Sequence, residues 1–159
     1  MFNAILTFRI IVMLSSISIL APVAYAQRTW ITLNPGFKLG YEFGEQSGFV
    51  FGGEISMVFR NSDHLSPYGG VVLAFDGCRG LQKLHLGIEG GDGIVGICIG
   101  PSLLSKDGEH DVGLTITPYA GAILIPYFSA TLSSRFGGIY DVGSYIKIPF
   151  SVKGEPDFE

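Results

Sequence analysis

Charged residues are scarce in this sequence, cysteine is rare, and no apolar run is long enough to form a membrane-spanning helix. Of 159 residues, 10 are Lys or Arg and 14 are Asp or Glu, so 15% are charged, whereas about 25% is usual. The formal net charge of −4 excludes the basic surface that nucleic-acid binding requires, so we expect no nucleic-acid partner. A mean hydropathy of +0.41 is too high for a disordered chain.

The N-terminus has the pattern of a signal peptide. Arg9 precedes an apolar run from Ile10 to about Ala21, and residues 24–26 read Ala-Tyr-Ala before Gln27. This order of charge, apolar run and small-x-small site is typical of a cleaved export signal. The run is short of the ~20 residues that a membrane helix needs, which disfavours the alternative of an uncleaved anchor. We predict a signal peptide over residues 1–26, and the remaining length indicates one domain.

After Gln27 the sequence alternates between apolar and other residues with a period of two, and no helical period appears. This alternation predicts strands with two different faces. Glycine is abundant, and all 23 glycines lie in this part of the chain. Turn-forming clusters divide it into eight strands, Leu33–Phe43, Phe49–Arg60, Tyr68–Asp76, Leu81–Glu89, Ile94–Leu104, Val112–Gly121, Leu124–Ser133 and Ile139–Phe150. We expect a barrel domain over 27–150 and a flexible tail over 151–159. Pro101, Pro118 and Pro126 are the weak points of this division, because proline cannot donate to a strand ladder.

The two faces of these strands differ sharply. One face collects thirty-nine positions, none of them charged, with Ser144 as the one polar residue. The other face carries basic and acidic residues in similar numbers and ten glycines. The predicted interior charge network on this second face consists of Lys38, Glu42, Glu54, Arg60, Lys83, Glu89, Asp141 and Lys147. Asp76 also falls on this face.

Alternation alone does not say which face points outward. A soluble ligand-binding barrel would place the apolar face inside. However, a water-facing surface needs many solvated side chains, whereas the second face is mostly small residues. An eight-stranded barrel also has room inside for side chains only. We therefore predict an all-β, eight-stranded, antiparallel up-and-down closed barrel with an apolar exterior. Aromatic residues near the strand ends are expected to form girdles, one of which would include Trp30, Tyr68 and Tyr119.

The signal peptide and the eight alternating strands resemble the small outer-membrane β-barrel proteins of Gram-negative bacteria. The last strand is similar to the assembly signal of that family at Asp141, Gly143, Ile146, Ile148 and Phe150. The resemblance implies a location in the bacterial outer membrane, lipid and the barrel-insertion machinery as partners, and a monomer. Two features depart from the family: nine residues follow Phe150, and the loops on both sides are short. Short loops disfavour a receptor or adhesion role.

No residue pattern predicts an enzyme, a cofactor or a metal site. Asp63, His64 and Ser66 are the one local cluster with the residue types of a lipid-acting enzyme, and a solvated turn explains them equally well. His110 also lies in a turn, whereas His85 is expected to join an internal network with Glu89. Cys78 and Cys98 are expected to remain thiols because one lies in a turn and the other in mid-strand. The glycines of residues 87–93 are not followed by a helix, so a phosphate-binding loop is excluded and a hairpin turn is expected.

These observations predict a membrane barrel with a filled, salt-bridged interior and a structural or interaction role, without catalysis. Two alternatives stay open. The first is a soluble exported barrel that binds an apolar ligand inside, and the second is a membrane-barrel enzyme that acts on lipid.

Overall fold

The fold is a closed β-barrel, seen in a computed structural model that describes residues 29–44, 47–61, 67–121 and 124–153. The predicted signal peptide lies outside these residues. Among the described residues no helix is long and apolar enough to cross a membrane, and crossing by strands is a separate question. The strands are β1 (Thr29–Phe43), β2 (Gly48–Asn61), β3 (Tyr68–Cys78), β4 (Leu81–Gly91), β5 (Val95–Lys106), β6 (Glu109–Ala120), β7 (Leu124–Ser133), β8 (Gly137–Lys147) and β9 (Phe150–Lys153).

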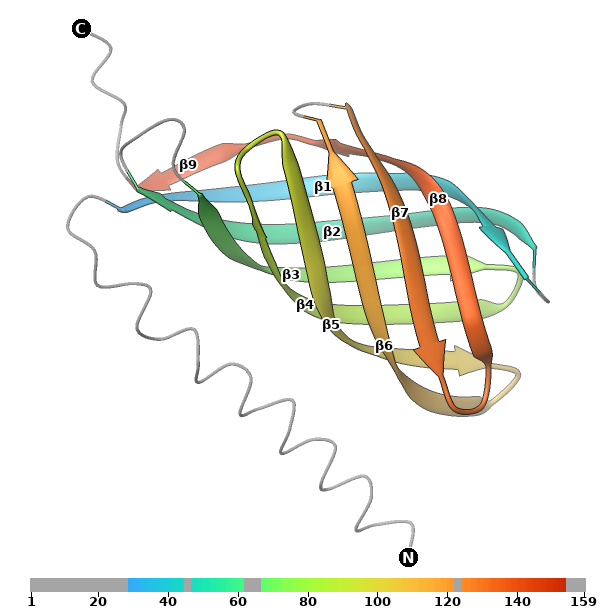
Figure 1. The fold of residues 1–159 in the computed structure, drawn as a ribbon. Helices are drawn as coiled ribbons and strands as arrows, with labels where there is room; N and C mark the ends of the chain where they lie inside the picture. The colour runs from blue at the N-terminus through green and yellow to red at the C-terminus, as the bar shows by residue number, and fades with distance from the viewer. Residues whose placement is uncertain (1–28, 45–46, 62–66, 122–123, 154–159) are drawn as a thin grey trace, which may run out of the picture.

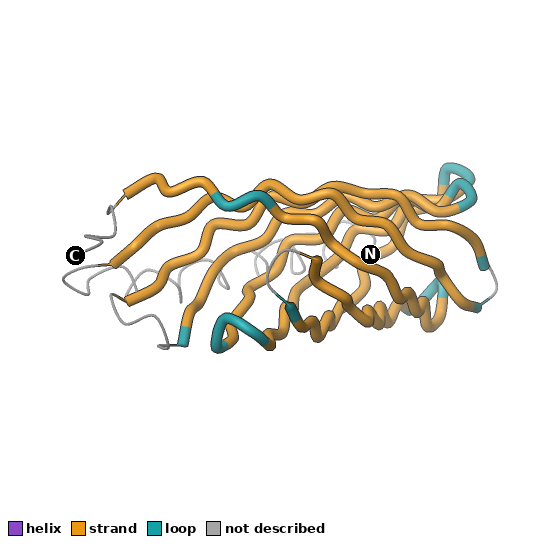
Figure 2. Tube along the Cα trace, turned by 90° about the horizontal axis from the view of Figure 1, so that it is seen from above, coloured by secondary structure: helices purple, strands orange, loops and turns teal. Residues whose placement is uncertain are grey.

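From β1 to β8, strands that follow one another in the sequence pair antiparallel (Figure 1). The barrel closes where β1 pairs with both β2 and β8. Turns lie at the two ends of the barrel, as Figure 2 shows in teal. The predicted fold class is therefore confirmed, with an eight-stranded up-and-down closed barrel.

β9 continues the eighth strand after a short break. β8 ends at Lys147, and β9 begins at Phe150 on the same side of β1. The break falls at Ile148 and Pro149, although the Ile148 N–H still donates to the carbonyl of Pro35. β9 extends to Lys153, three residues beyond the expected end of the barrel domain at residue 150. Residues 154–159 lie outside the described part of the chain.

The three prolines that weakened the strand prediction lie inside β5, β6 and β7. Pro101 pairs with Leu114 on one side, while the β4–β5 ladder is interrupted beside it, between the pairs His85–Ser102 and Ile88–Ile99. The β6–β7 ladder is interrupted in the same way beside Pro118. Each of these two prolines therefore breaks the ladder on one side only, and the strand continues through the ladder on the other side.

The turns at the end of the barrel where β3 and β5 end are tight. The β3–β4 turn is Arg79-Gly80 and the β5–β6 turn is Asp107-Gly108, with positive φ at all four residues. Two successive residues of positive φ form the type I′ turn, whose twist matches that of antiparallel strands. At the opposite end, Oδ1 of Asp92 accepts the N–H groups of Ile94 and Val95 at 2.9 Å. Those hydrogen bonds, from Val95 first, hold the pKa of Asp92 below its ordinary value.

The apolar face points outward on every strand, as expected. Side chains on this face remain well exposed, for example Phe49 at 71% and Phe51 at 56%. The second face lines the interior, where Lys38, Glu54 and Asp141 are buried. The direction of both faces therefore agrees with the alternation in the sequence.

Glycine on the inner face makes room for large side chains. Gly40 of β1 lies directly opposite Gly143 of β8. The hydroxyl of Tyr127 lies over both of them, where it would overlap a Cβ at Gly40 and lie 2.7 Å from a Cβ at Gly143. The carbonyl oxygen of Val142 also lies 2.6 Å from that Cβ of Gly40. A methyl group at Gly40 would therefore collide with backbone and with a packed ring.

We expect Gly40→Ala to destabilise the barrel by about 1–3 kcal/mol, because an overpacked site forces its neighbours to shift. Gly53→Ala is the matched control, since its Cβ would point outward with its nearest neighbour 3.7 Å away. The control should change stability by less than about 0.5 kcal/mol. Urea unfolding of both variants in detergent micelles measures the difference, and equal midpoints would contradict this account of the inner glycines.

Candidate functional site

The polar interior of the barrel is the candidate site, and its side chains form successive layers along the barrel axis. Register places them: inward residues of neighbouring strands lie opposite one another, as Asp76 does with Lys83 and Glu42 with Asp141. The layers comprise a four-ion cluster, a hydroxyl and histidine chain, a second ion cluster, and an aromatic row at the end of the barrel where β1 begins.

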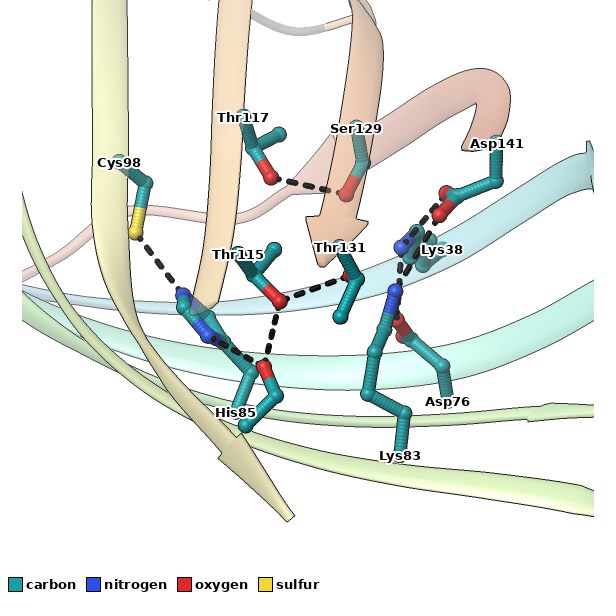
Figure 3. Close-up of polar contacts among 11 residues, drawn as sticks. Lys38, Asp76, Lys83, His85, Cys98, Thr115, Thr117, Ser129, Thr131 and Asp141 are labelled. Carbon is teal, nitrogen blue, oxygen red and sulfur yellow. Dashed lines mark hydrogen bonds and ion pairs between the residues drawn. The ribbon is translucent and has the colours of Figure 1, made fainter. Parts of the chain in front are cut away.

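The four-ion cluster alternates two lysines and two aspartates across the lumen. Lys38 Nζ lies 2.7 Å from Asp76 and 3.0 Å from Asp141, and Lys83 Nζ lies 3.2 Å from both (Figure 3). All four side chains are at most 6% exposed. Lys38 Nζ also lies 4.5 Å from the ring centre of Tyr127. Because each ion has two partners of opposite charge, the desolvation cost of burial is offset within the cluster.

The second ion cluster lies nearer than the four-ion cluster to the end of the barrel where β1 begins. Lys147 pairs with Glu54, and its Nζ lies 3.7 Å from Glu89. Tyr119 donates its hydroxyl to Glu89 at 2.9 Å, and Tyr68 shares a hydrogen bond of 2.6 Å with Tyr119. This cluster therefore links charges on β2, β4 and β8 with tyrosines on β3 and β6.

A chain of uncharged groups lies between the two ion clusters. His85 Nδ1 lies 3.0 Å from Ser102 Oγ, which lies 2.6 Å from Thr115 Oγ1. Thr115 continues to Thr131 at 2.8 Å. On its other side, His85 Nε2 lies 3.3 Å from the Sγ of Cys98 (Figure 3). These buried groups are thus satisfied by one another.

An apolar layer closes the lumen near the end of the barrel where β3 and β5 end, below an outer hollow of about 390 Å³. Leu81, Leu104 and Ile139 form a buried cluster, and Phe136 packs against it. Leu104 has an exposed fraction of 0%. This apolar layer separates the four-ion cluster from that end.

Two cavities lie among the polar layers. A small one of about 10 Å³ is bordered by His85, Cys98 and Glu89, which leaves room for roughly one water molecule. A larger one of about 360 Å³ opens at the end where β1 begins. We call this larger cavity the vestibule; it is lined by residues that include Trp30, Arg60, Tyr68, Tyr119 and Lys147.

The structure distributes the predicted interior network over these layers. Lys38, Lys83 and Asp141 lie in the four-ion cluster, and Glu54, Glu89 and Lys147 lie in the second cluster. Glu42 is buried at 4% exposure, and Arg60 lies at the mouth with its Cζ 5.5 Å from the ring centre of Tyr68. The prediction omitted Asp76, although its place on the charged face was visible in the alternation.

Two detailed expectations are wrong. His85 contacts Ser102 and Cys98 instead of Glu89, because residues four apart in a strand are about 13 Å apart. Trp30, Tyr68 and Tyr119 line the vestibule instead of an outer girdle. In the alternation of β1, β3 and β6, these three positions belong to the set of residues that points inward. The sequence therefore contained the information that places them inside.

The remaining predicted residues are placed as follows. Cys78 and Cys98 are buried thiols. Asp141 of the predicted assembly signal points inward, whereas Ile146, Ile148 and Phe150 are exposed outside. Asp63, His64 and Ser66 lie outside the described residues. Within the described part of the chain, no group of three or more His, Cys, Asp or Glu could hold a metal ion.

Comparison with models of known protein families, with curated proteins and with solved structures found no match to this chain.

We expect Lys38→Met to destabilise the barrel by about 3–5 kcal/mol, because it leaves Asp76 and Asp141 buried with one lysine between them. Lys106→Met is the matched control: its Nζ lies 3.9 Å from Asp107, at the surface, where an ion pair contributes about 0–1 kcal/mol. Urea unfolding compares the two variants.

The double variant Lys38→Met/Asp141→Asn leaves one cation, Lys83, paired with one anion, Asp76. It should recover part of the stability that Lys38→Met loses. A Lys38→Met variant as stable as the Lys106→Met control would show that the cluster is not stabilised by its charge pairing.

Proposed function

We propose that this chain is a small outer-membrane β-barrel protein with a filled, salt-bridged interior and a structural or interaction role without catalysis. In this proposal the signal peptide directs export, the barrel-insertion machinery assembles the protein, and the barrel functions as a monomer surrounded by lipid.

One observation carries the proposal: large apolar side chains are exposed on every strand. They include Phe37, Leu73, Ile97, Leu114 and Ile146, each 46–51% exposed. A water-soluble monomer rarely exposes a continuous apolar surface of this extent. Hydrocarbon solvates such a surface, and membrane barrels carry an apolar outer band for this reason.

The closed sheet supports the same proposal. Hydrocarbon cannot hydrogen-bond to the backbone, so a spanning sheet must satisfy its own N–H and C=O groups and leave no open edge. Here β1 pairs with β2 on one side and with β8 and β9 on the other. The barrel thus has the backbone arrangement that a lipid environment requires.

The interior favours a filled body over the alternative of a soluble carrier of apolar ligands. Such a carrier needs an apolar cavity, whereas the lumen of this barrel holds paired ions and hydroxyl chains. The apolar layer around Leu104 fills one end. The cavity of about 10 Å³ is too small for an apolar ligand, and the lining of the vestibule includes the charged residues Arg60, Glu89 and Lys147.

Cell fractionation tests the location. We expect the protein in the outer-membrane fraction and, after extraction, a heat-modifiable band on an SDS gel, because a closed barrel resists SDS until it is heated. The control is the same sample boiled before loading. A protein that stays soluble without detergent, and that migrates identically before and after boiling, would favour the soluble barrel.

Planar bilayer recording tests the filled interior. We expect conductance far below that of a water-filled porin measured in the same salt, because the ion clusters and the apolar layer occupy the lumen. Porin-like conductance from the purified protein would contradict a filled interior and would leave the outer-membrane location untouched.

A further inference from the structure

The vestibule is a second candidate site, with a chemistry that the structural role does not use. Its volume of about 360 Å³ falls within the range of small-molecule sites. It opens at the end of the barrel where β1 begins, and the second ion cluster forms its floor. The site is a feature of the interior, so it does not depend on whether the outer face meets lipid.

A cross-strand row forms the mouth of the vestibule. Register places Arg60 of β2 directly between Trp30 of β1 and Tyr68 of β3. Arg60 Cζ lies 5.5 Å from the ring centre of Tyr68. Stacking on an aromatic face holds a guanidinium in place while its edge N–H groups stay available for hydrogen bonds.

Within the described part of the chain, Arg60 differs from Lys147 in its pairing. Among the described residues no carboxylate lies within 4.0 Å of it, whereas Lys147 in the floor is paired with Glu54 and Glu89. Arg60 is therefore the cation of the described vestibule lining that is available to an anion entering from solution.

We propose that the vestibule binds the phosphate group of a small phosphate ester. Arg60 holds two phosphate oxygens through parallel N–H donors. Thr32, Asn34 and Ser56 line the wall below Arg60 and supply neutral polar groups. The volume exceeds what a bare anion fills, so it accommodates the organic part of the ester beside Trp30 and Tyr68.

The fluorescence of Trp30 provides the test, because it is the single tryptophan of the chain and it lines the vestibule. The full chain, refolded in neutral detergent, is titrated with glycerol phosphate at constant ionic strength. We expect a saturable change in emission and protection of Trp30 from iodide quenching. Sodium sulfate at matched ionic strength serves as the control for a nonspecific anion effect.

Arg60→Gln should weaken binding at least tenfold, because the charged bidentate donor is lost. The matched control Arg79→Gln removes a cation from the turn at the opposite end and should bind as the unaltered protein does. Arg60→Lys keeps the charge without the fork of donors and should bind with intermediate affinity. If Arg60→Gln does not fold, the Arg60→Lys variant and the iodide experiment on the unaltered protein still decide the question.

A second arm identifies the source of the phosphate. In it, phosphatidylglycerol is added to the neutral micelles in place of the soluble ester. A response to glycerol phosphate indicates a soluble ligand, and a response to the lipid alone indicates a headgroup; both support the phosphate site. The proposal is overturned if neither gives a saturable change, if sulfate gives the same change, or if Arg60→Gln binds as tightly as the unaltered protein.

Discussion

The structure depends on charge pairing inside a closed sheet. Lys38, Asp76, Lys83 and Asp141 come from β1, β3, β4 and β8, yet each lies within 3.2 Å of its partners. A slip of one residue in any of these strands would turn its charge outward and an apolar side chain inward. Because an unpaired buried ion costs several kcal/mol, the cluster disfavours such slips. Register and electrostatics therefore reinforce each other.

Side-chain size is the second constraint, because an eight-stranded barrel has little internal space. Tyr127 and Tyr145 lie with their ring centres 4.5 Å apart beside Lys38. The space for Tyr127 comes from the absence of side chains at Gly40 and Gly143. The high glycine content thus reflects volume matching across the lumen as well as turn geometry. Paired ions and matched volumes together explain how a polar lumen is filled.

The alternation in the sequence was enough to predict the strands, their number and the direction of their faces, because each of these follows from one strand at a time. The contacts inside were not predictable in the same way. Ser102 is the partner of His85 because it lies opposite on β5, and Lys38 meets Asp76 across the lumen. Such partners depend on the stagger of strands around the barrel, which no single strand encodes. The outer girdle predicted for Trp30, Tyr68 and Tyr119 is wrong for a different reason. That prediction rested on their position near strand ends, whereas the alternation places all three on the inward face.

The interior is asymmetric, and this asymmetry connects the filled body with the vestibule. At one end Leu81, Leu104 and Ile139 exclude water, and the four-ion cluster lies against this layer with its charges satisfied internally. At the other end, Lys147 is neutralised in the floor while Arg60 stays available at the mouth. A second hollow of about 390 Å³ lies outside the apolar layer, beside Leu81 and Ile139, so the layer separates it from the four-ion cluster. In the proposed function, this arrangement lets the barrel hold a small molecule at its mouth without passing one. The scarcity of charge in the sequence is therefore compatible with a specific site, because a single arginine with no carboxylate within 4.0 Å among the described residues keeps its attraction for an anion.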